Sequence, residues 1–230
     1  RFAAVLSEIS RDASHIFLLG DIFDLWVGGS SHFAYEFSPA VDQLRDFVKK
    51  GGELHYVEGN HDFHLKDFWA EQLGASVHRD AYTTNLFGQE VRVEHGDYIN
   101  PDDKLYFAWR AFMRSPFIKY PAKVVPGKVT AWIGQNLSAA SRKRTRGHSK
   151  EVNESILEKF RAFTEKRAQE FDFDLMVTGH VHVEADIEIR AQGKPVRSVN
   201  LGYWDTPKAF KLTGSSAEFI RFDLDDIRSA

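Results

Sequence analysis

Four short clusters in the sequence place carboxylate, amide or imidazole side chains next to glycine. They are Gly20-Asp21-Ile22-Phe23-Asp24, Gly59-Asn60-His61-Asp62, His95-Gly96-Asp97 and Gly179-His180-Val181-His182. Oxygen and imidazole donors without sulfur suit manganese, iron or zinc ions. Two such ions about 3.5–4 Å apart can clamp a phosphoryl group and generate a hydroxide nucleophile. The residue types therefore predict a metal site for the hydrolysis of phosphate esters or anhydrides.

The position of the clusters along the chain strengthens this interpretation. A single histidine beside a glycine is more often a structural residue than a ligand. Here each cluster follows a short apolar run, and loops at the carboxyl ends of strands converge in α/β sheets. Four such clusters favour one shared metal site over four unrelated structural roles.

The surrounding sequence predicts the elements that position these clusters. Apolar runs predict buried strands at residues 15–19, 54–57 and 175–178. A hairpin is predicted between residues 82–86 and 90–94, and later strands at residues 185–190, 196–201, 210–212 and 218–222. Helices are predicted at residues 1–10, 38–50, 65–73, most of 102–146, and 150–171. The mixture predicts an α/β protein with its chemistry at strand ends.

Length and composition exclude several classes of protein. A chain of 230 residues fits one domain, and 43% hydrophobic residues are enough for a sizeable core. The absence of cysteine excludes disulfides, thiolate zinc sites and a cysteine nucleophile. No stretch approaches the roughly 20 apolar residues that span a bilayer.

The charge of the chain is distributed unevenly. Residues 104–150 contain eleven lysines and arginines and no acidic residue, whereas the whole chain has a net charge of −3. Apolar residues are interleaved with these cations: Phe107, Trp109, Phe112, Met113, Phe117, Ile118, Val124, Val125, Trp132, Ile133 and Leu137. Such a segment can bury acyl chains and lie on an anionic bilayer. The alternatives are a solvated helical surface for the charges and ordinary core packing for the apolar residues.

The motifs Gly-Asp-x-x-Asp, Gly-Asn-His-Asp and Gly-His-x-His resemble the signature of calcineurin-like metallophosphoesterases over about residues 15–205. The resemblance implies a two-sheet β-sandwich flanked by helices, formed as a single domain by residues 1–230, with a helical insertion at residues 104–146. It implies that Asp21 bridges two metal ions. The remaining implied ligands are Asn60, His95 and His180 at one ion, and His182 with Asp21 at the other.

The same resemblance implies the residues that act on the leaving group. His61 matches a histidine of the family that contacts the phosphate and protonates the leaving oxygen. Asp24 matches the carboxylate that orients this histidine. Asp62 is expected to bond to local backbone rather than to metal.

One part of the family pattern has no match in the printed chain. The family begins with a strand and an Asp-x-His motif that supplies two ligands to the first metal. Residues 1–10 instead match the first helix of the family. We therefore expect a segment that precedes Arg1 to be missing from the printed sequence, which would bind only one metal well by itself.

Within the family, the sequence is similar to the UDP-2,3-diacylglucosamine hydrolases of lipid A biosynthesis. The similarity lies in residues 17–28, in the spacing of residues 95–106, and in the helical insertion. It implies contacts of Asp103 and Tyr106 with the glucosamine-phosphate part of the substrate. Arg142 and Arg144 could contact the diphosphate or uridine, and Lys150 lies where a substrate-binding helix of that group starts. His61 is a departure, because the best-known branch has arginine at this position.

These observations lead to one expected function and two alternatives. We expect a hydrolase with two divalent metal ions, manganese first and iron or zinc as alternatives, that cleaves UDP-2,3-diacylglucosamine to 2,3-diacylglucosamine 1-phosphate and UMP. Such an enzyme would be cytoplasmic and peripherally associated with the inner membrane. The alternatives are a soluble phosphatase or phosphodiesterase and a non-catalytic binding scaffold. The acidic remainder of the chain disfavours nucleic acid as a partner.

Overall fold

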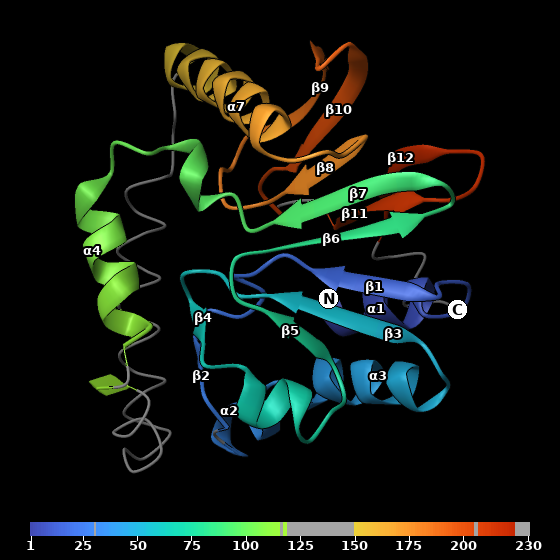
Figure 1. The fold of residues 1–230 in the computed structure, drawn as a ribbon. Coiled ribbons are helices and arrows are strands. Elements are labelled where there is room, and N and C mark those ends of the chain that lie inside the picture. The colour runs from blue at the N-terminus through green and yellow to red at the C-terminus, as the bar shows by residue number, and fades with distance from the viewer. Residues whose placement is uncertain (30, 116, 119–149, 205–206, 224–230) are drawn as a thin grey trace.

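The computed structural model describes residues 1–230 except 30, 116, 119–149, 205–206 and 224–230, and it folds the described residues around two facing sheets (Figure 1). The first sheet is parallel and has the order β1-β3-β5, formed by β1 (His15–Leu18), β3 (Glu53–Val57) and β5 (Ser76–His78). The second sheet is mixed and has the order β6-β7-β8-β10-β9. Its strands are β6 (Ala81–Leu86), β7 (Gln89–Glu94), β8 (Leu175–Thr178), β9 (Glu184–Ala191) and β10 (Lys194–Leu201).

Two small ribbons complete the strands of the described residues. They are β2 (Trp26–Val27) with β4 (Asp62–Phe63), and β11 (Lys208–Leu212) with β12 (Ala217–Arg221). Facing sheets with helices outside confirm the predicted two-sheet α/β architecture.

Helices cover the outer faces of both sheets (Figure 1). The helices α1 (Phe2–Ile9), α2 (Ser31–Glu36) and α3 (Ser38–Lys49) pack on the first sheet, whereas α7 (Lys150–Glu170) packs on the second. α3 buries Ala40, Val41, Leu44 and Phe47, the spacing of an amphipathic helix, and has a proline in its first turn. Every residue of β8 is buried, as expected for a strand covered on both faces.

The helix α4 (Lys104–Met113) lies beside the ends of the strands rather than on the face of a sheet (Figure 1). It is the described part of the predicted helical insertion, most of which falls in residues 119–149, outside the described residues. Among the described residues, no helix has both the length and the apolar character needed to cross a bilayer.

The layer between the sheets contains an aromatic stack as well as aliphatic side chains. The ring of His55, on the first sheet, stacks at 4.7 Å on Phe17 and at 4.8 Å on Tyr82 of the second sheet. His78 stacks at 4.1 Å on the same tyrosine, and its Nε2 lies 3.1 Å from Nδ1 of His55. Two facing imidazoles are therefore part of the inter-sheet packing.

Most predicted elements are confirmed, and the differences lie in short segments. The hairpin of β6 and β7 and the helices α1, α3 and α7 agree with the sequence prediction within a few residues. The helix predicted at residues 65–73 forms only in its middle, as a short π-helix at Lys66–Ala70. The helix α2 and the strands β2, β4 and β5 were not predicted, since each is too short for a periodic pattern.

Candidate metal centre

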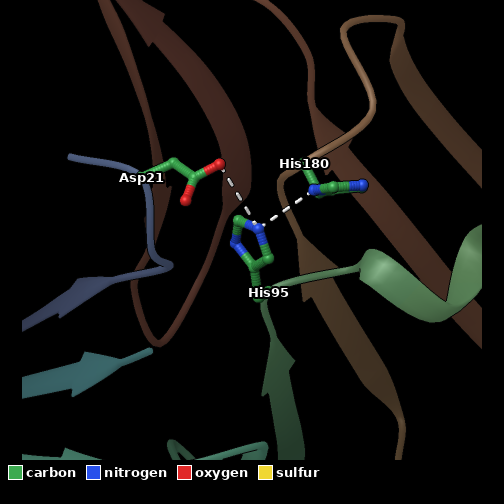
Figure 2. Close-up of side chains that lie close together, drawn as sticks. All are labelled: Asp21, His95 and His180. Carbon is green, nitrogen blue, oxygen red and sulfur yellow. Dashed lines mark hydrogen bonds and ion pairs between the residues drawn. The ribbon is translucent and has the colours of Figure 1, made fainter. Parts of the chain in front are cut away.

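Four strand ends deliver the central residues of the site, and Figure 2 shows three of these residues, Asp21, His95 and His180. Asp21 follows β1 and Asn60 follows β3, both in the first sheet, whereas His95 follows β7 and His180 follows β8 in the second sheet. The predicted convergence of distant loops therefore occurs, and the site lies at the seam between the two sheets.

Glycine allows these loops to approach one another. Gly20 has a φ of +79°, and a Cβ atom there would lie 2.5 Å from Nδ1 of His95 and 2.6 Å from Cα of Gly59. Asp21 and His180 themselves have left-handed φ values of 54° and 65°. Non-glycine residues rarely adopt this region, and where they do they concentrate at functional sites.

The donor atoms of Asp21, His95 and His180 all lie within 4.8 Å of one another. Nε2 of His95 is 3.5 Å from Oδ2 of Asp21 and 3.0 Å from Nδ1 of His180. Oδ1 of Asn60 lies 3.1 Å from each of these two histidine nitrogens. One carboxylate, one amide oxygen and two imidazoles around one point fit a divalent metal ion of the manganese, iron or zinc type.

A main-chain carbonyl fixes the tautomer of His95. Its Nδ1 donates a hydrogen bond of 2.7 Å to the oxygen of Leu19, because a carbonyl can only accept. Nε2 is left as the nitrogen with a lone pair, and it is the nitrogen that faces the other donors. A second bond of this kind orients metal-binding histidines in proteins.

The electrostatics of the site favour, for Asp21 and His180, the protonation states that metal binding requires. Burial, followed by the neighbouring His95, lowers the pKa of His180 to about 4. Burial alone would raise the pKa of Asp21, but His95, His61 and His180 together lower it. At neutral pH the site therefore combines a neutral His180 imidazole with a charged carboxylate.

The loop after β3 wraps around Asp21. Oδ1 of Asp21 accepts hydrogen bonds of 2.8 Å from the main-chain N–H groups of both Asn60 and His61. Nδ1 of the His61 ring donates to the main-chain oxygen of Asp24 at 3.0 Å. Asp24 thus holds the His61 ring through its backbone, a contact that the carboxylate analogy did not anticipate.

Asp62 has the structural position that was expected for it. Its fully buried carboxylate accepts hydrogen bonds from the Tyr56 hydroxyl at 2.8 Å and from the main-chain N–H of Gly59. Burial and the nearby charge of Asp21 raise the pKa of Asp62 to about 6. Asp62 therefore shapes the loop that presents Asn60, and the expectation of local backbone bonding is confirmed.

The other residues predicted for the metal and substrate sites lie outside this cluster or outside the described residues. His182 lies outside the group formed by Asp21, His95 and His180, and its ring is 5.1 Å from that of Tyr203. Arg142 and Arg144 lie outside the described residues. Lys150 begins α7, but its side chain is not among those described.

Asp103 and Tyr106 connect α4 to the site. Asp103 caps α4 by accepting a hydrogen bond of 3.0 Å from the main-chain N–H of Tyr106. The hydroxyl of Tyr106 donates to Asp97 at 3.3 Å, and its ring lies 5.2 Å from that of His180. The start of the insertion therefore borders the metal centre.

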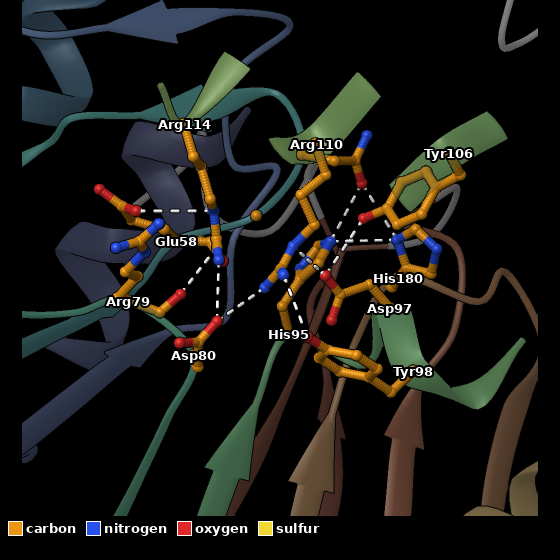
Figure 3. Close-up of polar contacts among 12 residues, drawn as sticks. Glu58, Arg79, Asp80, His95, Asp97, Tyr98, Tyr106, Arg110, Arg114 and His180 are labelled. Atoms are coloured by element: carbon orange, nitrogen blue, oxygen red, sulfur yellow. Dashed lines mark hydrogen bonds and ion pairs between the residues drawn. The ribbon is translucent and has the colours of Figure 1, made fainter. Parts of the chain in front are cut away.

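A buried network of arginines beside the centre was missed by the sequence interpretation (Figure 3). Arg110 forms an ion pair with Asp97 and donates to Asp80 at 2.9 Å. Arg114 donates to Asp80 at 2.8 Å and to the main-chain oxygen of Arg79 at 2.7 Å. These two of the eleven cations therefore face inward rather than toward solvent or a membrane. The one available signal was their spacing of four residues, which places both on one face of α4.

Comparisons with known proteins agree with this geometry. A family model described as calcineurin-like phosphoesterase matches residues 1–184. A protein of Haemophilus influenzae named UDP-2,3-diacylglucosamine hydrolase is 28% identical, covering 88% of this chain and 82% of its own. Proteins of the same name from Salmonella typhi and Ectopseudomonas mendocina are each 27% identical over 97% of this chain, covering 91% and 90% of their own lengths.

Proposed function

Because the chain belongs to the calcineurin-like phosphoesterase family and is thus a hydrolase of phosphate bonds, we propose that it cleaves UDP-2,3-diacylglucosamine to 2,3-diacylglucosamine 1-phosphate and UMP. The observation that carries the hydrolytic part is the convergence of Asp21, His95 and His180 within 4.8 Å. The choice of this substrate is supported by relatives named UDP-2,3-diacylglucosamine hydrolase, which match 88–97% of this chain at 27–28% identity.

The proposed metal ligands are the donor side chains that meet at the seam, together with His182. Asp21, Asn60, His95 and His180 hold one divalent ion, and Asp21 and His182 take part in holding a second. Manganese is proposed first, with iron and zinc as alternatives. When bound, such ions supply positive charge for the phosphoryl oxygens and lower the pKa of a water ligand.

The protein residues have separate proposed tasks. Asp21 is fixed by two main-chain N–H groups and so offers its carboxylate in one orientation. His61, held at Nδ1 by the oxygen of Asp24, carries the proton for the leaving oxygen on Nε2. Asp24 is a positioning residue in this scheme.

The substrate is proposed to lie along α4. Tyr106 borders the metal centre and, with Asp103, is placed to meet the glucosamine-phosphate part. Leu105, Trp109 and Phe112 are exposed on the same helix and suit acyl chains. Arg142, Arg144 and Lys150 are proposed to meet the diphosphate or uridine. An enzyme that acts on such a lipid would work in the cytoplasm, at the surface of the inner membrane.

One assay separates the lipid substrate from a soluble one. Purified protein with manganese is given UDP-2,3-diacylglucosamine and, separately, a soluble phosphodiester, and the release of UMP or of alcohol is followed. We expect UMP release at the higher kcat/KM, and we expect Asp21→Asn to abolish it. Cleavage of the soluble ester alone would refute the lipid proposal while leaving the family assignment intact.

A soluble phosphatase or phosphodiesterase remains the second candidate. The observation that favours it is His61, which stands where the best-known branch of the lipid hydrolases has arginine. An arginine keeps its proton, whereas a histidine can transfer one, so the two side chains act on a phosphate in different ways. The non-catalytic scaffold is disfavoured by the four donors that meet at the seam, Asp21, Asn60, His95 and His180.

A further inference from the structure

A cavity of about 340 Å³ lies between α4 and the residues that follow β5. Its lining residues are Arg79, Asp80, Tyr98, Phe107, Arg110, Ala111 and Arg114. Three guanidinium groups and a single carboxylate therefore form the charged part of the wall (Figure 3). None of these residues belongs to the metal centre.

Arg110 and Arg114, the two buried arginines of the wall, share the solvent-exposed carboxylate of Asp80 as a hydrogen-bond acceptor. The side chains of Arg110 and Arg114 are only 9% and 5% exposed, yet both donate to the same oxygen, Oδ1 of Asp80. The side chain of Asp80 is 59% exposed, so water competes for this carboxylate. Buried charges are costly unless they are fully paired, and an incoming anion can therefore take over part of the role of Asp80.

The pairing of the arginines in the cavity is also incomplete. Among the described residues, Nε of Arg114 has no hydrogen-bond acceptor, and the carboxylate of Glu58 is 3.9 Å away. Arg79 is exposed at the rim of the cavity and offers its main-chain oxygen, rather than a charge, to Arg114. Nε of Arg114 and the exposed guanidinium of Arg79 are therefore the donors of the wall without an acceptor within hydrogen-bond distance in the described residues.

We propose that this cavity binds a phosphate monoester group, at a site separate from the metal centre. Guanidinium groups form paired hydrogen bonds with phosphate oxygens. A tetrahedral phosphate has enough oxygens to accept from three arginines, and the exposed guanidinium of Arg79 forms no ion pair among the described residues. The aromatic rings of Tyr98 and Phe107 leave room for a small attached group, and the volume is within the range of ligand sites.

The two sites are connected through Arg110. Its guanidinium pairs with Asp97 as well as with Asp80, and Asp97 accepts the hydroxyl of Tyr106, whose ring borders His180. A phosphate that replaces Asp80 would change the partners of Arg110 and, through it, the contacts of Asp97. The occupancy of the cavity is therefore expected to alter hydrolysis at the metal centre.

Calorimetry with inorganic phosphate tests the site apart from the metal centre. The manganese-supplemented full-length protein with Asp21→Asn serves as background, because metal-dependent phosphate binding is removed there. We expect this variant to bind phosphate, and an added Arg79→Glu to weaken binding at least about tenfold. Arg79→Lys should restore much of the affinity. Thermal unfolding checks that each variant is folded, which the exposure of Arg79 favours.

Arg11→Glu is the matched control, since Arg11 is also exposed and pairs only with Glu8 in the described residues. Equal phosphate affinity in Arg11→Glu and Arg79→Glu, or the absence of phosphate binding in the Asp21→Asn background, would overturn the site. Vesicles of phosphatidylcholine with phosphatidic acid, compared with glycerol 3-phosphate, identify the source of the phosphate. Capture by vesicles that depends on Arg79 assigns a lipid headgroup, whereas binding of glycerol 3-phosphate alone assigns a soluble ester.

Discussion

The carboxylate of Asp21 is surrounded by two main-chain N–H donors and by the ring of His95. An amide at this position keeps an acceptor for the N–H groups but removes the negative charge that a metal ion requires. We therefore expect Asp21→Asn to retain the fold and to lose both bound manganese and turnover. Elemental analysis and circular dichroism measure these two effects, and full metal content in the variant would contradict the proposed ligand.

His61 tests the acid step separately from metal binding. Its ring is held by the oxygen of Asp24, and it is not among the proposed metal ligands. His61→Ala should keep its manganese and lower kcat by roughly 10²–10⁴, the usual contribution of a general acid. A kcat equal to that of the unmodified protein would remove His61 from the mechanism, and a loss of metal would reassign it as a ligand.

At the residue scale, local motifs were enough to predict the donors but not their surroundings. Asp21, Asn60, His95 and His180 each come after a strand and stand next to a glycine, a signal that can be read from neighbouring residues. The ion pair between Arg110 and Asp97 cannot be read in this way, because it depends on how α4 docks.

At the scale of elements, α4 is fastened by buried charges. Arg114 lies 3.9 Å from the carboxylate of Glu58 and donates to the main-chain oxygens of Glu58 and Arg79. Arg114→Met would leave a buried carboxylate without its cation, and we expect it to lower the free energy of unfolding by about 3–5 kcal/mol. Denaturant unfolding of the variant measures this loss.

The double variant Glu58→Gln with Arg114→Met provides the control for this pair. It removes both charges, so its loss of stability should be smaller than that of Arg114→Met alone. Arg11→Met, at an exposed position, should stay within about 0.5 kcal/mol of the unmodified protein. Equal losses in the single and double variants would mean that the ion pair does not hold α4.

The elements themselves were predictable where their pattern is long. α3 and the hairpin of β6 and β7 repeat their periodicity over enough residues to be recognised. β2 and β4 have two residues each, and they become strands only because residues far apart in the chain pair with each other. Tertiary contact, rather than local preference, decides such segments.

At the scale of the whole molecule, the stack of His55, His78 and Tyr82 joins the two sheets and makes their association sensitive to pH. Burial is the largest cause that lowers the pKa of both histidines below 6.5. In the unfolded chain these histidines take up protons near pH 6.5, whereas in the folded protein they do so only at lower pH. Their contribution to the free energy of unfolding is therefore complete above pH 6.5 and is lost as the pH falls below it. We therefore expect the midpoint temperature of thermal unfolding to decrease as the pH is lowered from about 7.5 to about 5.5.

The variant His78→Gln isolates this contribution from that of other titrating groups. His180, with its lowered pKa, and Asp62, with its raised pKa, are present in both proteins and cancel in the difference. The midpoint of His78→Gln should therefore depend less steeply on pH. Parallel curves for the two proteins would show that the histidine stack does not respond to acid.

The location of the donors at the seam also bears on when the protein can acquire its ion. Asp21 and His180 are separated by most of the chain and meet only after both sheets have closed. A ribosome must therefore synthesise more than three quarters of the printed sequence before the first complete set of donors exists. For a metal site built from these donors, we therefore expect loading to be a late step of biogenesis.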